Sequence, residues 1–226
     1  MSAFKPRLVL LGKQGAGKGT QAARIAQHYG IPHVATGDLF RAAVQDGSAF
    51  GQELQRYMDK GELVPDEIVI EVIKEQLGRS ELMEQGVVLD GFPRTLHQAE
   101  VLDELLTEHP LDLVVDLDVP TEIVLHRIAG RRVCSSCATT YHVDEPPTVD
   151  GVCDSCGGAV VQRDDDTEVA VMRRLELYEL QTLPLIHYYR RSGRLAHVDG
   201  RGPSEQVFQA LVEIIDRRVG SGGGRA

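Results

Sequence analysis

The 226-residue chain contains 42% hydrophobic and 26% charged residues, which is the composition of an ordinary globular protein. Its 34 acidic and 24 basic side chains give a formal charge of −10, which argues against a protein that grips nucleic acid. The longest apolar run, Leu8 to Leu11, has four residues, so we expect no transmembrane helix, no secretory signal and a cytoplasmic location. The length fits one domain with insertions.

The chain begins with a pattern of strand, glycine-rich turn and helix. Residues 7–11 are an apolar run typical of a buried strand. Residues 12–19 are rich in glycine, and residues 18–29 have apolar side chains at helical spacing. Gly30 and Pro32 then predict the end of that helix.

Strand and helix patterns alternate through most of the remaining chain. The further apolar runs are residues 87–89, 113–117 and 195–198, and the helix-like stretches between and around them include residues 66–77, 95–108 and 167–189. This alternation predicts an α/β fold with a parallel sheet, in which ligands bind at the carboxyl ends of the strands. Gly12, Asp90 and Asp199 all fall close to such strand ends.

Residues 12–18 match the pattern G-x-x-x-x-G-K between a strand and a helix. In such a loop, backbone amides and a helix N-terminus surround phosphate oxygens while the lysine adds a positive charge. The alternative is a glycine-rich turn with an incidental lysine, which the flanking elements disfavour. Position 19 is Gly rather than Ser or Thr, so the usual magnesium hydroxyl is missing or displaced to Thr20.

All four cysteines lie in two C-x2-C pairs separated by fifteen residues: Cys134, Cys137, Cys153 and Cys156. Two such pairs can complete a tetrahedron of thiolates, and this spacing predicts a structural zinc site with no open position for catalysis. Disulfides, free thiols and iron remain alternatives. We interpret His142, whose offset fits neither pair, as structural.

Four motifs now make the chain recognisable. Residues 12–20, 36–41, 89–95 with Gln98, and 130–132 resemble the motif set of adenylate kinases, and the resemblance runs from about Leu8 to Val198. The chain is most similar to the long bacterial form, whose lid carries a zinc-binding insert. The family usually has Pro where this chain has Gln14, a departure that we expect to be tolerated.

The resemblance implies a P-loop nucleoside monophosphate kinase fold with two mobile insertions. The implied core comprises residues 1–35, 65–126 and 167–220, and residues 221–226 form a flexible tail. Residues 36–64 would be a helical AMP-binding insert, and residues 127–166 a lid over ATP that holds the zinc site.

The resemblance also implies the reaction ATP + AMP ⇌ 2 ADP with Mg²⁺. A monomer is the default expectation, and the acidic charge and short apolar runs predict no nucleic-acid or membrane partner. Phosphoryl transfer needs alignment and charge stabilisation, for which arginine is well suited. The implied catalytic residues are Lys18, Arg94, Arg131, Arg163 and Arg174. The implied ATP contacts are Gly15, Ala16, Gly17, Lys18, Gly19, Thr20, Arg127 and Arg131, with Arg127 against adenine. The implied AMP contacts are Thr36, Arg41, Gly91, Arg94, Gln98, Arg163 and Arg174.

Several of these residues also have simpler interpretations. Asp90 would hold Mg²⁺ through water, or it is an aspartate of a strand-terminal turn. The Gln98 amide can read an adenine edge, although an exposed helical glutamine is the simpler interpretation of that residue alone. Asp164 and Asp165 could pair with lid arginines or form a solvated acidic run.

Three other functions fit parts of the sequence. A kinase of the same architecture could use a pyrimidine acceptor such as UMP or CMP. A nucleic-acid-binding module could use the cysteine pairs, which the acidic charge disfavours. A nucleotide switch is disfavoured by Gly19 and by arginines supplied within the chain.

Overall fold

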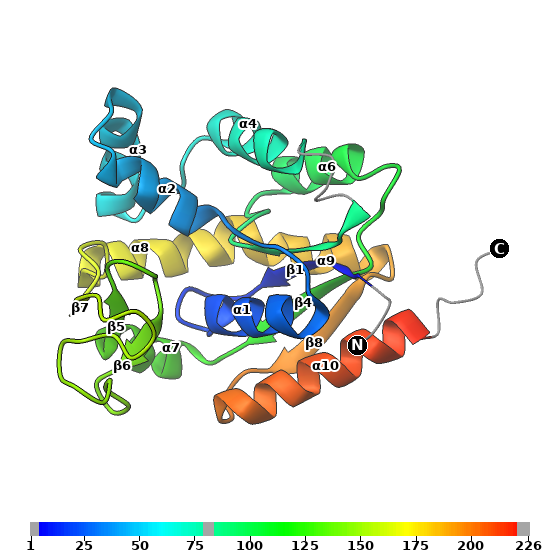
Figure 1. Cartoon of the computed structure of the whole chain (residues 1–226). Helices are drawn as coiled ribbons and strands as arrows, with labels where there is room; N and C mark the ends of the chain where they lie inside the picture. The colour runs from blue at the N-terminus through cyan, green and yellow to red at the C-terminus, as the bar shows by residue number, and fades with distance from the viewer. Residues whose placement is uncertain (1–4, 79–83, 221–226) are drawn as a thin grey trace.

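The computed structural model describes residues 5–78 and 84–220, and it has a central sheet with helices on both faces (Figure 1). The sheet has five parallel strands in the order β2-β3-β1-β4-β8. Their bounds are β1 (Arg7–Leu11), β2 (His33–Ala35), β3 (Val87–Asp90), β4 (Leu113–Asp118) and β8 (Leu195–Asp199). The predicted parallel α/β fold is therefore confirmed. The predicted flexible tail at 221–226 lies outside the described residues.

The helices account for most of the remaining core. They are α1 (Lys18–Tyr29), α2 (Thr36–Gln45), α3 (Ala49–Lys60), α4 (Asp66–Leu77), α6 (Leu96–Leu105), α7 (Thr121–Ala129), α8 (Glu168–Leu177), α9 (Leu183–Arg191) and α10 (Ser204–Gly220). The helices predicted at 18–29 and 66–77 have the predicted bounds. The stretch predicted at 167–189 is helical but divided, because a π-helical turn at Tyr178–Thr182 separates α8 from α9.

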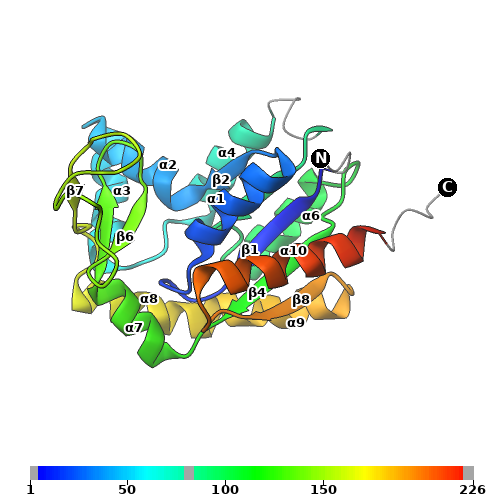
Figure 2. The same ribbon diagram turned by 60° about the horizontal axis from the view of Figure 1, so that its bottom comes forward.

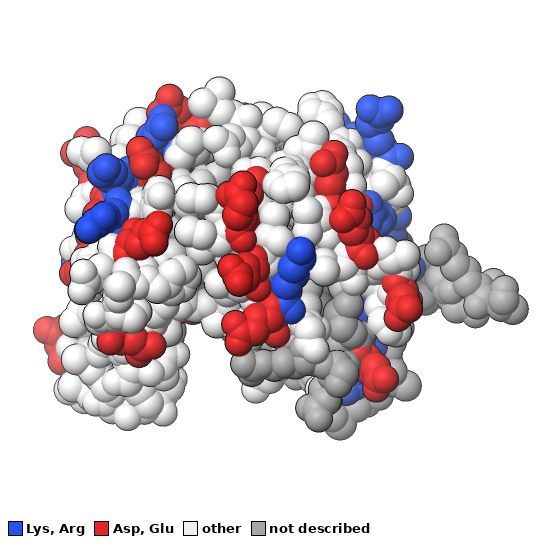
Figure 3. Space-filling view, turned by 90° about the horizontal axis from the view of Figure 1, so that it is seen from above, with Lys and Arg blue, Asp and Glu red and all other residues white. Residues whose placement is uncertain are grey.

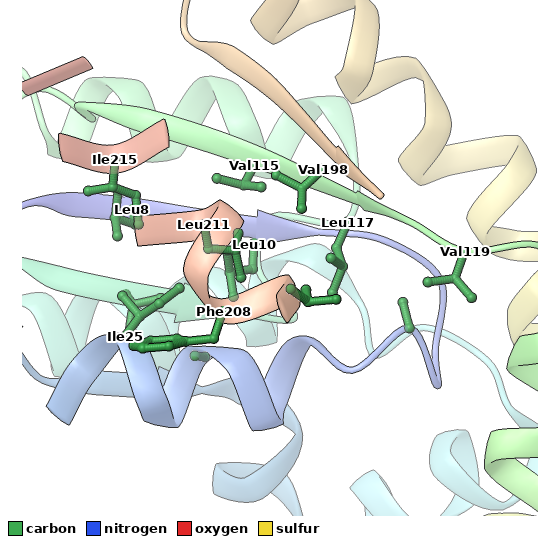
Figure 4. Packing of buried hydrophobic residues seen from close by; sticks show 14 of the residues in the cluster. Leu8, Leu10, Ile25, Val115, Leu117, Val119, Val198, Phe208, Leu211 and Ile215 are labelled. Carbon is green, nitrogen blue, oxygen red and sulfur yellow. The ribbon is translucent and has the colours of Figure 1, made fainter. Parts of the chain in front are cut away.

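The strand β1 shows why the sheet is buried on both faces. Leu8 and Leu10 belong to the core cluster beneath α1 and α10, where they lie among Ile25, Phe208 and Leu211 (Figure 4). The alternate residues of β1, Val9 and Leu11, belong to a second cluster with residues of α4, α6 and α9. Alternating side chains of one apolar strand thus bury both faces, as a strand with helices on both sides requires.

Two regions depart from the alternation, as predicted. Residues 36–64 contain the adjacent helices α2 and α3. Residues 131–161, called the cysteine insert below, form a small antiparallel sheet of β5 (Arg131–Cys134), β6 (Thr140–His142) and β7 (Val160–Val161). Figure 2 shows this insert standing at one end of the molecule, beside α7 and away from α10.

The surface charge and the helices fit the acidic composition and the short apolar runs of the sequence. On the face in Figure 3, acidic side chains are interspersed with basic ones and no continuous basic track is visible among the described residues. Within residues 5–78 and 84–220, no helix combines the length and apolar character needed to cross a bilayer.

Candidate functional site

A cavity of about 1110 Å³ lies at the carboxyl ends of β1 and β3 and extends between the two insertions. Apart from the cysteines, of which only Cys137 reaches it within the described residues, every site residue predicted from the sequence lines this cavity. These residues are Gly15, Ala16, Gly17, Lys18, Gly19, Thr20, Thr36, Arg41, Asp90, Gly91, Arg94, Gln98, Arg127, Arg131, Arg163 and Arg174. The structure thus brings together residues that span most of the chain, although their individual roles remain predictions.

The glycine-rich loop after β1 leads directly into α1. Gly17 caps that helix with a positive φ of 100°, a backbone conformation that glycine adopts without strain. The ammonium group of Lys18 donates hydrogen bonds to the Gly12 and Lys13 carbonyls, at 2.8 and 2.9 Å. Burial lowers the pKa of Lys18 to about 8, although Asp90 opposes this shift. The loop therefore holds a cation and a helix N-terminus beside the cavity, the combination that favours a phosphate.

Asp90 ends β3, the strand that pairs with β1, and it lies beside the phosphate loop. A Cβ atom on Gly19 would lie 3.2 Å from Asp90 Oδ2, and His33 Nε2 lies 3.9 Å from the same oxygen. Burial raises the pKa of Asp90, but the partners His33, Lys18 and Arg94 outweigh burial and hold that pKa below its usual value. The carboxylate is therefore ionised at neutral pH. As a hard oxygen ligand in a nucleotide-sized cleft, it fits the predicted Mg²⁺.

Several arginines crowd the middle of the cavity. Burial lowers the pKa of Arg94 to about 10, and the charge of Arg174 adds to the shift. Burial also lowers the pKa of Arg163 to about 10, with repulsion from Arg41 and Arg131. The Arg163 Nε atom is buried without a hydrogen-bond partner in the described part of the chain. Cations that repel one another in a cleft favour an anionic ligand that neutralises them.

Carboxylates hold two of these arginines in place. Asp166 accepts from Arg131 Nε at 2.8 Å and also pairs with the end of that guanidinium. Asp165 accepts from Arg174 at 2.7 Å. Asp164, predicted as one alternative to pair with a lid arginine, is exposed, and Asp166 pairs with Arg131 instead.

The predicted base-binding residues lie where helix α2 and the β3–α6 loop meet. Thr36 is buried and its hydroxyl lies 3.4 Å from the Asp90 carbonyl. Gly91 has a φ of 80°, and a Cβ there would approach Thr36 Oγ1 to 2.7 Å. The Gln98 amide is already engaged, because it accepts from the Arg94 backbone at 2.8 Å and donates to Asp66 at 2.7 Å. It retains one N–H and one acceptor lone pair for a ligand.

Arg127, at the end of α7, reaches across to the core. Its guanidinium donates to the Ala16 carbonyl at 3.2 Å and to the Gly200 carbonyl at 2.9 Å. Burial lowers its pKa. The side chain therefore lies between the phosphate loop and the segment after β8, a place that the sequence motif alone did not specify.

The four cysteines form one cluster at the cysteine insert. Their sulfur atoms all lie within 4.8 Å of one another, with Cys134–Cys156 at 3.5 Å and Cys137–Cys153 at 3.6 Å. These separations exclude disulfides and come close to the ~3.8 Å edge of a tetrahedron with Zn–S bonds of about 2.3 Å.

Neighbouring groups shift the pKa values of the cysteines in different directions: against the backbone N–H of Gly158, the sulfurs of Cys137 and Cys134 raise the pKa of Cys156 to about 12. A hydrogen bond from the Tyr141 hydroxyl lowers the pKa of Cys153 to about 5. A Cβ on Gly158 would lie 2.9 Å from Cys134 Sγ, so only glycine leaves room for that sulfur. The cluster therefore fits a four-coordinate zinc ion, as the spacing predicts.

Comparisons with known proteins point to one family. A sequence model of the family described as "Adenylate kinase" matches residues 10–194. The chain is 49% identical to the adenylate kinase of Thermodesulfovibrio yellowstonii over 215 residues, covering 94% of this chain and 100% of that protein. It is 48% identical to the adenylate kinase of Bacillus subtilis over 211 residues, covering 92% of this chain and 97% of the relative. With the phosphate loop, the clustered arginines and the cysteine insert in one fold, these matches show that the chain belongs to the adenylate kinase family.

Proposed function

We propose that this protein catalyses reversible transfer of a phosphoryl group from ATP to AMP, giving two ADP. The observation that carries the proposal is the convergence of Lys18, Arg94, Arg163 and Arg174 on one cavity beside the phosphate loop. The phosphates of two nucleotides that meet in this cavity would supply the negative charge that neutralises these cations.

The residues have distinct roles in this proposal. The backbone amides of residues 15–20 and the Lys18 side chain bind the ATP phosphates. Arg127 lies against the adenine of ATP, and Arg131 contacts ATP from the lid. Arg41 and Arg94 bind the AMP phosphate, and Arg163 and Arg174 stabilise the group in transfer. Asp90 would hold Mg²⁺ through water, and this ion would neutralise charge on the β- and γ-phosphates.

We further propose that the two insertions close over the substrates. Residues 127–166 would cover ATP, and residues 36–64 would cover AMP, while residues 1–35, 65–126 and 167–220 form the core. Closure would exclude water and so suppress hydrolysis of ATP. A structural Zn²⁺ at the four cysteines would rigidify the cysteine insert, which has little apolar core of its own.

A pyrimidine acceptor is the runner-up. The buried Gln98 favours AMP over UMP, because the remaining N–H and acceptor of its amide can serve adenine N1 and its amino group. CMP presents the same acceptor and amino donor, so this contact alone does not separate it from AMP. UMP presents the opposite donor and acceptor at the corresponding edge.

A coupled assay of ADP formation from MgATP with AMP, CMP, UMP or GMP tests the proposal. We expect strong preference for AMP. Comparable rates with UMP or CMP would overturn the acceptor assignment but keep the phosphoryl-transfer chemistry. Transfer to none of the four would overturn the proposed reaction. The expected monomer and cytoplasmic location remain predictions, and light scattering by the purified protein tests the first.

A further inference from the structure

A second group of metal-ligating side chains lies outside the cysteine cluster. His126 is on α7, His142 ends β6, and Asp144 follows in the next turn. One ligand atom from each lies within 4.8 Å of the other two. His126 Nε2 lies 3.3 Å from Asp144 Oδ2, and His142 Nδ1 lies 3.1 Å from the same oxygen.

These separations suit a small divalent ion. Tetrahedral zinc with bonds of about 2.0–2.1 Å to nitrogen and oxygen places its ligand atoms about 3.3–3.4 Å apart. The two histidine–carboxylate distances are therefore already close to those of a coordinated ion. Two imidazoles and one carboxylate are also a ligand set that late first-row transition metals accept, with positions left for water.

The ring of His142 is fixed by its surroundings. A Cβ on Gly130 would lie 2.0 Å from His142 Nε2, so the ring packs directly over that glycine. The backbone N–H of Asp144 donates to the Nδ1 lone pair at 3.2 Å, so an ion bound at Nδ1 would replace this hydrogen bond. Nε2 lies 3.5 Å from the His126 carbonyl, and a backbone carbonyl is a common partner for the second nitrogen of a metal-bound histidine.

This group is distinct from the four cysteines. Successive residues of a strand point to opposite faces. Tyr141 directs its hydroxyl to Cys153, and the next residue of β6, His142, directs its ring to His126 and Asp144. The two groups therefore lie on opposite sides of β6, and an ion bound by one is not a ligand position of the other.

We propose that His126, His142 and Asp144 form a second metal site, which binds Zn²⁺ in addition to the ion expected at the cysteines. The His126 and Asp144 side chains are 70% and 65% exposed, so this site is weaker and exchanges more readily than the four-cysteine site. The simpler account is a hydrogen-bonded pair of histidines around one surface carboxylate, without a metal.

An ion at this site would join α7 to the cysteine insert. His126 precedes Gly130 in the chain, whereas His142 and Asp144 follow the turn from β5 to β6. The Val143 N–H already donates to the Gly130 carbonyl at 2.9 Å, so the connection lies at a packed junction. Binding would therefore stabilise this junction in the folded protein, and the melting temperature would rise with the logarithm of the zinc concentration once that concentration exceeds Kd.

Calorimetric titration with Zn²⁺ tests the proposal, using protein without a purification tag whose cysteines hold one equivalent of zinc. We expect one further equivalent with micromolar affinity and a melting temperature that rises with added Zn²⁺. In His126→Asn and Asp144→Asn the further equivalent should bind at least about tenfold more weakly. His97→Asn, which removes an exposed histidine on α6, is the matched control and should bind zinc as the wild type does.

Two results would overturn the second site: no further equivalent in the wild type, or equal affinity in His126→Asn, Asp144→Asn and wild type. Retention of the first zinc equivalent in each variant shows that the cysteine insert has folded. Visible absorption bands of added Co²⁺ give a second readout, because four- or five-coordinate cobalt absorbs far more strongly than hydrated cobalt. If added Co²⁺ gave no such absorption bands with the wild-type protein, this result would also contradict the proposal.

Discussion

The side-chain amide of Gln14, in the phosphate loop, donates a hydrogen bond of 3.3 Å to Asp166, whose side chain is fully buried and also pairs with Arg131. The family usually has proline at position 14, which could not make this bond. In this chain the loop is therefore tied directly to the segment that follows the cysteine insert. The Gln14 Oε1 atom is buried without a hydrogen-bond partner among the described residues.

Substitutions at Gln14 should distinguish the effect of this hydrogen bond on stability from its effect on catalysis. Gln14→Ala removes both the donor and the unpaired oxygen, so we expect the free energy of unfolding to change by less than about 1 kcal/mol. Gln14→Glu places a second carboxylate against Asp166 and near the proposed position of the ATP phosphates. We expect it to cost about 1–2 kcal/mol of stability and to raise KM for ATP. Urea unfolding and steady-state kinetics measure both effects, and Gln55→Glu on the exposed face of α3 is the control. Equal effects at positions 14 and 55 would contradict the argument.

Two consecutive arginines on α8 provide a matched test of the proposed transfer site. Arg174 lines the cavity and pairs with Asp165, whereas the Arg173 side chain is 41% exposed and pairs with Glu176 on the same helix. We expect Arg174→Ala to lower kcat on the order of a hundredfold, as for other losses of a preorganised charge contact. Arg173→Ala should keep kcat within about twofold, because exposed ion pairs contribute little. Single-turnover rates at a temperature where both variants are folded decide the matter, and similar rates in the two variants would remove Arg174 from the mechanism.

The buried charge of Lys18 should lower the stability of the folded protein, although the proposed reaction needs that charge. Burial lowers its folded-state pKa from 10.5 to about 8, so between these values the unfolded chain binds more protons than the folded chain. Stability contributed through this group therefore rises as the pH increases from about 8 to 10.5, and the penalty is complete below pH 8. The free energy of unfolding of Lys18→Met, minus that of the wild type, should therefore be more positive at pH 7 than at pH 10. Turnover should fall on the order of a hundredfold.

Denaturant unfolding of nucleotide-free protein at several pH values measures this difference. The lost hydrogen bonds to Gly12 and Lys13 add a pH-independent cost, so only the change with pH tests the argument. A difference between Lys18→Met and wild type that is constant from pH 7 to 10 would refute it. Lys74→Met, at an exposed lysine of α4, is the control for replacing a lysine with methionine.

Local features of the sequence predicted much of this site. The phosphate loop is one continuous segment between a strand and a helix, and α1 begins and ends at the predicted residues. The four cysteines lie within 23 residues, and their spacing alone indicated the cluster that the structure contains. Such features depend on short-range geometry, which the order of residues in the chain specifies.

Contacts between distant residues were not predictable in the same way. Gln14 and Asp166 are 152 positions apart, and no local pattern pairs them. The same holds for Gln98, whose amide is held by Asp66 from another helix. The strand β2 has only three residues and gives too short a periodic signal. The π-helical turn after α8 also has no marked sequence signal, because its residues are as compatible with an α-helix.

Zinc removal should affect folding before it affects catalysis. The four sulfur atoms hold only the cysteine insert, and the phosphate loop and Arg174 are positioned by other elements. We therefore expect protein stripped with a zinc chelator, and then assayed without chelator and with Mg²⁺ present, to have a melting temperature lower by several degrees while turnover at 25 °C falls less than about threefold. Cys153→Ser should reproduce the chelated behaviour, and Ser155→Ala, an exposed neighbour, should not. Prompt loss of activity on chelation, with the circular dichroism spectrum and melting temperature unchanged, would mean that the metal acts in the reaction itself rather than through the stability of the insert.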